Sequence, residues 1–181
     1  MDLARKKLDE ISQNEAFLQK HDIRVKVCGN ISLAPQDVQT TMQEVEKRTE
    51  KNQSLLLNIA FCYDSTYEME RLFNKYYEDH EKNGLNNEEV ELSSKRLLNK
   101  YLLIPNEPDI LVRTSNEIRL SDFMTFQSGL SMLTFLEENW PEMSIWSILK
   151  IILRYQVEEK NFLIIKESIE KNAKKVKEVL V

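Results

Sequence analysis

The sequence predicts an α/β fold in which a parallel sheet is flanked by helices, with a further helix at the C-terminus. Short apolar runs recur along the chain, segments with helical periodicity lie between them, and 41% of the 181 residues are hydrophobic. Strands that alternate with helices pair in parallel, because each connecting helix returns the chain to the same end of the sheet. A chain of this length can bury a core of ordinary size.

The N-terminal third supplies the first two strands. Residues 2–20 repeat apolar side chains at helical spacing, and residues 23–27 alternate apolar with basic side chains, which predicts a helix and then a strand ending at Gly29. A helix is expected from Pro35 to about Lys51, because Val38, Met42 and Val45 share one helical face. Residues 55–61 form an almost continuous apolar run, typical of a strand buried on both faces.

The rest of the chain repeats the alternation. The expected elements are a helix from Asp64 or Ser65 to Asn83, a polar helix at about 88–101, buried strands at 109–113 and 131–136, a short helix near 121–129, and a helix at 144–155. Residues 1–156 are expected to form the globular domain and residues 157–181 an amphipathic helix. That helix has an apolar face and a lysine-rich face, which suits a membrane surface or packing against the protein or a partner subunit.

Composition excludes several classes of site. The net charge of −5 argues against a general nucleic-acid binder, and three glycines are too few for a dinucleotide fingerprint or a P-loop. Two histidines give no zinc-ligand spacing, no apolar run is long enough to span a bilayer, and the first residues do not resemble a signal peptide. Cys28 and Cys62 lie in apolar runs and are expected to be buried thiols on the cytosolic side of the cell.

The most specific chemistry lies between Pro108 and Phe123. A strand that ends at Arg113 leads into a hydroxyl-rich loop, and ligands of open α/β sheets bind beyond the carboxyl ends of strands. Arg113 and Arg119 can donate to phosphate oxygens, and hydroxyls and the start of the next helix, capped by Ser121, add donors. The segment predicts a diphosphate site. It also allows a surface loop with arginines paired to Asp109, Glu117 and Asp122.

This segment resembles the signature of the cis-prenyltransferase (undecaprenyl diphosphate synthase) family. Residues 113–127 are similar to the eukaryotic pattern Arg-Thr-Ser-Gly-Glu-x-Arg-Leu-Ser-Asp-Phe-Leu-x-Trp-Gln, and residues 139–142 to Leu-Trp-Pro-Glu. Residues 1–5, 25–30 and 57–63 resemble the animal dehydrodolichyl diphosphate synthases of that family. The resemblance implies condensation of isopentenyl diphosphate onto an allylic diphosphate, such as farnesyl diphosphate, to make long-chain cis-polyprenyl diphosphate for dolichol synthesis.

The resemblance also implies site residues and a cofactor. It assigns the diphosphate of isopentenyl diphosphate to Arg113, Arg119 and Ser121, with Ser115 as a weaker candidate, and Mg²⁺ as the cofactor. Asn116 stands where the family prefers glycine, and Asn tolerates a left-handed backbone, so the loop is still expected to form. Phe126 replaces a tryptophan. Met132 replaces a metal-binding glutamate of bacterial members that the animal enzymes also lack.

Two family motifs have no counterpart in these residues. The Asp-Gly-Asn-Arg-Arg motif is absent, so the N-terminal part of the family domain is expected to be missing and the chain alone to be inactive. The Arg-x-Gly ending of homodimeric members is also absent, which implies a Nogo-B-receptor-like partner that anchors the complex at the cytosolic face of the endoplasmic reticulum membrane. A non-catalytic fragment or regulatory subunit of the same complex is the alternative, but the pattern from Arg113 to Ser121 favours the catalytic lineage.

Overall fold

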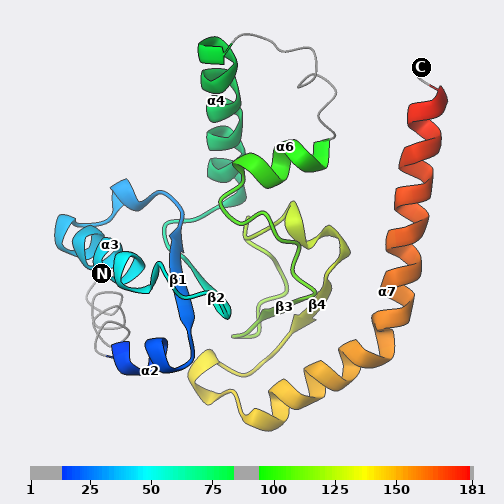
Figure 1. The fold of residues 1–181 in the computed structure, drawn as a ribbon. Helices are drawn as coiled ribbons and strands as arrows, with labels where there is room; N and C mark the ends of the chain where they lie inside the picture. The colour runs from blue at the N-terminus through cyan, green and yellow to red at the C-terminus, as the bar shows by residue number, and fades with distance from the viewer. Residues whose placement is uncertain (1–13, 84–93, 180–181) are drawn as a thin grey trace. The chain divides into compact units, whose positions relative to one another are not determined.

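A computed structural model of the chain describes residues 14–83 and 94–179, which belong to two compact units (Figure 1). One unit extends to Pro105 and the other begins at Asn106. Each unit contains one pair of parallel strands with helices, so the predicted α/β class is confirmed. The strands of the described part form two two-stranded sheets, one in each unit.

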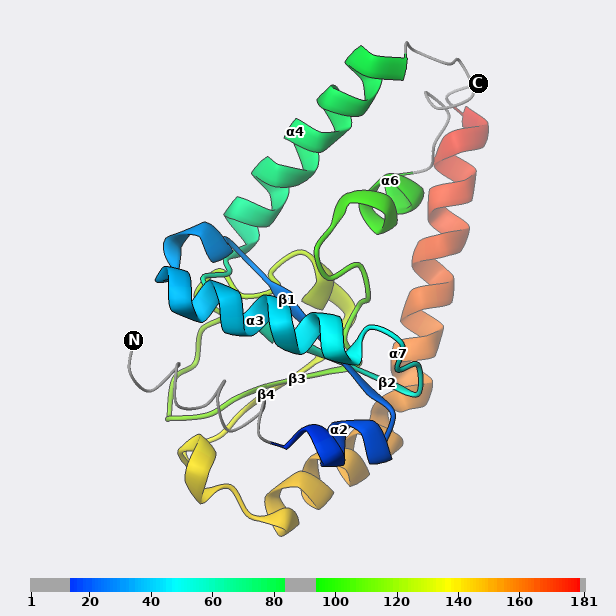
Figure 2. The same cartoon turned by 60° about the vertical axis from the view of Figure 1, so that its left-hand side comes forward.

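In the first unit, strand β1 (Ile23–Cys28) pairs in parallel with β2 (Leu55–Ala60), in a register that joins Ile23 to Leu55 and Cys28 to Ala60. The connection passes through the short 3₁₀ helix η1 (Ile31–Leu33) and helix α3 (Gln36–Thr49). Figure 2 shows α3 lying over β1. The buried side chains recur at helical spacing on α3 and alternate along β1, and together they make the core: Val25, Val27, Val38, Met42 and Val45.

Strand β2 is less covered than its composition predicts. Leu55, Leu56 and Leu57 are 53%, 48% and 39% exposed, so the expectation of a strand buried on both faces is wrong for these residues. Among the described residues β2 has β1 as its only strand neighbour, and Ile59 is the β2 side chain that packs against the α3 core. The continuous apolar run therefore predicted the strand correctly, but it did not predict how far neighbouring elements cover the strand.

Helix α4 (Ser65–Asn83) begins where the capping residues predict. The Asp64 carboxylate accepts the main-chain N–H of Tyr67 at 2.7 Å, which satisfies one of the free donors of the first turn. Inside the helix the carboxylate of Glu68 is buried and accepts the Tyr63 hydroxyl at 2.6 Å and the main-chain N–H of Ile104 at 2.9 Å. This carboxylate thus ties the start of α4 to the end of the first unit.

Two predicted helices lie partly outside the described residues. Of the helix expected at 2–20, the structure describes α2 (Glu15–Lys20), and of the one expected at 88–101 it describes α6 (Ser94–Tyr101). Tyr101 and Leu102 pack on Leu72 of α4. In the described part of the chain, no helix is both long and apolar enough to cross a membrane.

In the second unit, strand β3 (Ile110–Arg113) pairs in parallel with β4 (Met132–Phe135), and Arg113 lies opposite Phe135. Two 3₁₀ helices, η2 (Gln127–Leu130) and η3 (Trp140–Glu142), precede and follow β4. In the described residues, the helices expected at 144–155 and 157–181 are one helix, α7 (Ile145–Val179), drawn in orange and red in Figure 1. The predicted domain boundary at 156/157 thus falls within α7, and the domain division remains a prediction.

The short α-helix expected near 121–129 does not form. Ser121, Asp122 and Met124 have positive φ angles of 51°, 59° and 47°, which an α-helix of L-residues cannot accommodate. Helical structure begins only at Gln127, as the single 3₁₀ turn of η2. Ser121 consequently caps no helix, and the predicted contribution of a helix N-terminus to the site is wrong.

Gly29, which follows β1, gives a direct test of the first unit. Its φ is 133°, and a Cβ added there would overlap the carbonyl oxygen of Phe61, which main-chain bonds hold beside β1. We expect Gly29→Ala to lower the free energy of unfolding by about 3 kcal/mol or more, because neither backbone can yield. Gly129→Ala is the matched control, since a Cβ there meets nothing within 4 Å. Equal urea midpoints for the two variants, followed by circular dichroism, would contradict this account of Gly29.

Candidate functional site

The predicted diphosphate segment leaves the carboxyl end of β3, the edge of a parallel sheet where ligands bind in α/β folds. Its first residues stay attached to the chain that leaves β4. The main-chain N–H of Leu136 donates to Arg113 O at 2.8 Å, that of Asn116 to Leu136 O at 2.9 Å, and that of Ser115 to Glu138 O at 2.9 Å. The loop after Arg113 is therefore held by main-chain bonds beyond the strand ladder.

Arg113 closes this loop. Its Nη1 donates to the main-chain oxygen of Arg119 at 2.7 Å and to Ser121 Oγ at 2.9 Å. A guanidinium has five N–H donors in a rigid fork, and both contacts use the same nitrogen. Two of the predicted site residues, Arg113 and Ser121, are thus brought together across eight positions of sequence.

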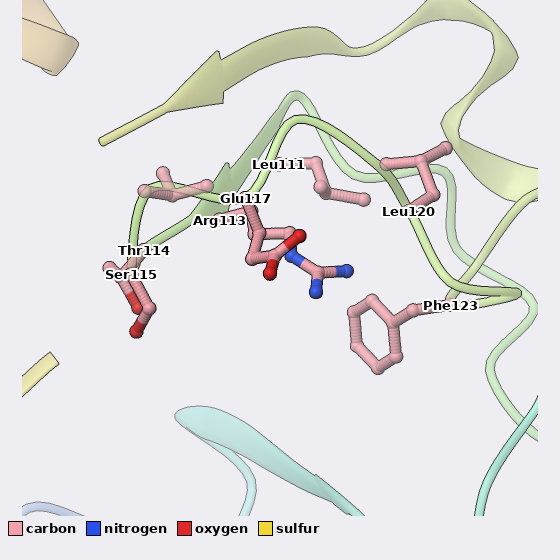
Figure 3. A pocket seen from close by; sticks show the side chains of 8 residues that line it. Leu111, Arg113, Thr114, Ser115, Glu117, Leu120 and Phe123 are labelled. Atoms are coloured by element: carbon pink, nitrogen blue, oxygen red, sulfur yellow. The ribbon is translucent and has the colours of Figure 1, made fainter. Parts of the chain in front are cut away.

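A cavity of about 340 Å³ opens at this end of β3. Figure 3 shows the Arg113 guanidinium and the Glu117 carboxylate in the space between Ser115 and the ring of Phe123. The lining combines polar groups with apolar side chains: Leu111, Val112, Arg113, Thr114, Ser115, Glu117, Leu120 and Phe123. Such a lining suits a small ligand with a charged head and an apolar body.

Arg119 is placed differently from the prediction. Its side chain is 66% exposed and does not line the cavity; its Nε lies 2.9 Å from Glu117 Oε2. The Glu117 pairing is the one that the surface-loop alternative predicts. An exposed ion pair contributes little, because water screens it and two long side chains lose entropy. Glu117, which lines the cavity, therefore connects Arg119 to the site without holding it strongly.

The loop backbone contains five left-handed residues. Besides the three that replace the expected helix, Ser115 has a φ of 71° and Asn116 of 55°. Asn116 thus has the left-handed backbone that its residue type was expected to tolerate. For Ser115, Ser121 and Met124 the residue type gave no such signal, because serine and methionine do not favour this region.

The described residues do not make a magnesium site of their own. Among them no group of three or more His, Cys, Asp or Glu side chains could hold a metal ion. Mg²⁺ in proteins that act on phosphates takes one or two carboxylates and completes its shell with phosphate and water. Glu117 is the one carboxylate in the lining of this cavity. A protein-only cage for the predicted cofactor is thus not supported by this part of the chain.

Of the two cysteines expected to be buried, Cys28 is the one enclosed by the protein. Cys28 is fully buried and unpaired with another cysteine, and its burial raises the pKa of the thiol above its usual value. Such a thiol is a poor nucleophile, as the expectation of a structural cysteine requires. Cys62 is only half-buried, so the expectation of a buried thiol is confirmed for Cys28 and not for Cys62.

Comparison with protein families decides the lineage. The Prenyltransf model of the undecaprenyl diphosphate synthase family matches residues 1–163. The chain belongs to the cis-prenyltransferase family. Over 159 residues it is 34% identical to the human dehydrodolichyl diphosphate synthase complex subunit DHDDS, a match that covers 87% of this chain and 47% of the human protein. The chain therefore spans about half the length of that relative.

Archaeal cis-prenyltransferases are similarly related. The tritrans,polycis-undecaprenyl-diphosphate synthase (geranylgeranyl-diphosphate specific) of Methanocaldococcus jannaschii is 32% identical over 164 residues, which cover 90% of this chain and 58% of the archaeal protein. In this second case too, the chain matches little more than half of its relative.

Solved structures agree on the fold. A probable undecaprenyl diphosphate synthase from Campylobacter jejuni superposes with a TM-score of 0.71 at 24% identity, over 86% of this chain and 68% of that one. Lavandulyl diphosphate synthase from Lavandula x intermedia, solved in complex with dimethylallyl diphosphate, superposes with a TM-score of 0.73 at 20% identity, over 84% of this chain and 66% of that one. At these identities the two structures support the cis-prenyltransferase fold and nothing finer.

The left-handed position at Asn116 yields a prediction within the second unit. Asn116→Gly should leave the free energy of unfolding within about 1 kcal/mol, because glycine adopts this conformation freely. Asn116→Val should lower it by about 2 kcal/mol, since a β-branched side chain is strained there. Fluorescence of Trp140 and Trp146, which lie in the same unit, can follow urea unfolding. A valine variant as stable as the glycine variant would show that the loop does not adopt this backbone.

Proposed function

We propose that the loop from Arg113 to Ser121 binds the diphosphate of isopentenyl diphosphate. The observation that carries the proposal is the contact of Arg113, which lines a partly apolar cavity, with Ser121, in a chain of the cis-prenyltransferase family. The reaction is condensation of isopentenyl diphosphate onto an allylic diphosphate, farnesyl diphosphate, to extend a cis-polyprenyl diphosphate. In that reaction the chain supplies the site for the homoallylic substrate.

The residues suggest how the diphosphate is held. Arg113 uses Nη1 within the protein, and a guanidinium has further donors on Nη2 and Nε that match phosphate oxygens. Ser115 and Thr114 add hydroxyls from the lining. A diphosphate carries more charge than a carboxylate, so it can compete with Glu117 for the exposed guanidinium of Arg119.

The apolar part of the lining suits the five-carbon body of the same substrate. Leu111, Leu120 and Phe123 line the cavity beside the polar groups. With the diphosphate fixed, these side chains orient the double bond of isopentenyl diphosphate toward the allylic carbon and keep water from the developing carbocation. Positioning and charge neutralisation are then the contributions of this loop to the rate.

Dolichol synthesis is the pathway we propose for the product. Its support is the similarity to human DHDDS, a subunit of a dehydrodolichyl diphosphate synthase complex, together with Met132 at the position of the bacterial glutamate. Mg²⁺, which the family implies, would enter with the diphosphate oxygens, since the described residues lack a cage for it.

Arg119→Ala tests the site. We expect the Kd for isopentenyl diphosphate, measured by calorimetry on the 181-residue chain, to rise about tenfold to a hundredfold, because a charge-assisted contact to the diphosphate is lost. Arg154→Ala, which removes an exposed arginine from α7, is the control for net charge and should leave the Kd near the wild-type value. The same loss of affinity in both variants would remove Arg119 from the site.

A turnover assay tests whether the 181-residue chain can catalyse prenyl transfer by itself. We propose that the 181-residue polypeptide by itself does not catalyse transfer, because it carries the isopentenyl diphosphate loop but no Asp-Gly-Asn-Arg-Arg motif. Incubation with farnesyl diphosphate, radiolabelled isopentenyl diphosphate and Mg²⁺ should give no labelled polyprenyl product. Labelled product from the purified chain would show that the motif is dispensable.

The proposed enzyme is a complex of this chain's protein with a second subunit. We propose a Nogo-B-receptor-like subunit that supplies the Arg-x-Gly motif and holds the complex at the cytosolic face of the endoplasmic reticulum membrane. The human relative is a complex subunit, which supports a heteromer. A longer polypeptide that joins these 181 residues to an Asp-Gly-Asn-Arg-Arg segment should be weakly active alone and strongly activated by the co-purified partner. Equal turnover with and without the partner would contradict the heteromer.

A further inference from the structure

The main chain at Glu138 supports the loop that carries Ser115 and Asn116. The N–H of Ser115 donates to Glu138 O and that of Asn116 to Leu136 O, both at 2.9 Å. These bonds hold two consecutive left-handed residues, which would otherwise relax toward commoner backbone conformations. The position of Ser115 in the cavity lining therefore depends on where the chain at Glu138 lies.

The side chain of Glu138 is in turn fastened to α7. Ser147 Oγ lies 3.0 Å from Glu138 Oε1 and 2.9 Å from Oε2, and its hydroxyl donates to this carboxylate. Ser147 is fixed in the first turn of the helix, where its N–H donates to Ser144 Oγ at 3.2 Å. Farther along α7, Ile151 is buried, and Lys166 Nζ lies 3.5 Å from a carboxylate oxygen of Glu107 in the same unit.

We propose that Glu138 is a positioning residue of the isopentenyl diphosphate site, acting through Ser147 and through its own main-chain oxygen on Ser115. For its ligand this inference rests on the proposed function. Glu138 does not line the cavity, so its effect on the substrate passes through the loop. The helix α7 thereby sets the geometry of a loop that lies more than twenty residues earlier in the chain.

Charge and positioning predict opposite results for Glu138. A carboxylate repels a nearby diphosphate, so if only its charge mattered, Glu138→Ala and Glu138→Gln would both strengthen binding. If Glu138 positions the loop, alanine loses the Ser147 contact and weakens binding. Glutamine keeps a carbonyl oxygen that can accept the Ser147 hydroxyl, so it should restore binding.

The experiment compares Glu138→Ala, Glu138→Gln and Ser147→Ala in the 181-residue chain. Glu137→Ala, at the neighbouring exposed carboxylate, is the control. The two readouts are the Kd of isopentenyl diphosphate by calorimetry and the amide hydrogen exchange rate of Ser115 by NMR. We expect Glu138→Ala and Ser147→Ala each to raise both quantities by about threefold to tenfold, the size of one surface hydrogen bond. Their combination should add little, because both remove the same contact.

The outcomes separate this inference from the proposed function. Unchanged Ser115 exchange in Glu138→Ala, or tighter binding in both Glu138 variants, would overturn the positioning role and leave the proposed function standing. Faster exchange with an unchanged Kd would also overturn it, because the loop would then move without consequence for the ligand. A wild-type chain that does not bind isopentenyl diphosphate would overturn the proposed function together with the ligand part of the inference, while exchange would still decide whether Glu138 holds the loop.

Discussion

One guanidinium nitrogen closes the loop that carries the candidate site. Arg113 is the last residue of β3, so the sheet fixes where its side chain begins, and Nη1 then reaches both Arg119 O and Ser121 Oγ. These bonds close the loop in place of the expected helix cap, because Ser121, Asp122 and Met124 are left-handed and no α-helix starts there. A lysine in this place would lack the planar fork that can bond the loop and still present donors to a phosphate. Leu120, which lies between the two groups that Arg113 contacts, and Phe123 line the cavity at the end of β3.

Much of the fold was predictable because burial leaves a periodic pattern in sequence. The alternation of residues 23–27 marked β1, and Val38, Met42 and Val45 marked the face of α3 that packs against it. Asp64 predicted the start of α4, since a carboxylate before the first turn satisfies its free N–H groups. Parallel pairing followed from the helical connection between β1 and β2.

The remaining features depend on contacts that one sequence does not reveal. A short helix was expected near residues 121–129, yet Ser121, which Arg113 contacts, and Asp122 and Met124 have left-handed backbones. The three leucines of β2 are apolar, but how far they are covered depends on neighbouring elements. At the site, the resemblance named Arg113, Ser115, Arg119 and Ser121; the structure brings the first two to the cavity lining and Ser121 to Arg113, and pairs Arg119 with Glu117. Glu117 was expected as a partner of the arginines in the surface-loop alternative, and the structure adds that it lines the cavity. Glu138 was not foreseen, because its contact with Ser147 is a tertiary one.

A titration of the wild-type chain with isopentenyl diphosphate, followed by two-dimensional NMR of backbone amides and arginine Nε–H groups, tests whether the loop after β3 binds a diphosphate. A diphosphate site in this loop predicts saturable shifts that gather at residues 111–123 and include the side chains of Arg113 and Arg119. Inorganic diphosphate should compete, and isopentenyl alcohol, which has the same body without the charged head, should not. Shifts that centre elsewhere in the chain, or equal shifts with the alcohol, would contradict a diphosphate site at the end of β3.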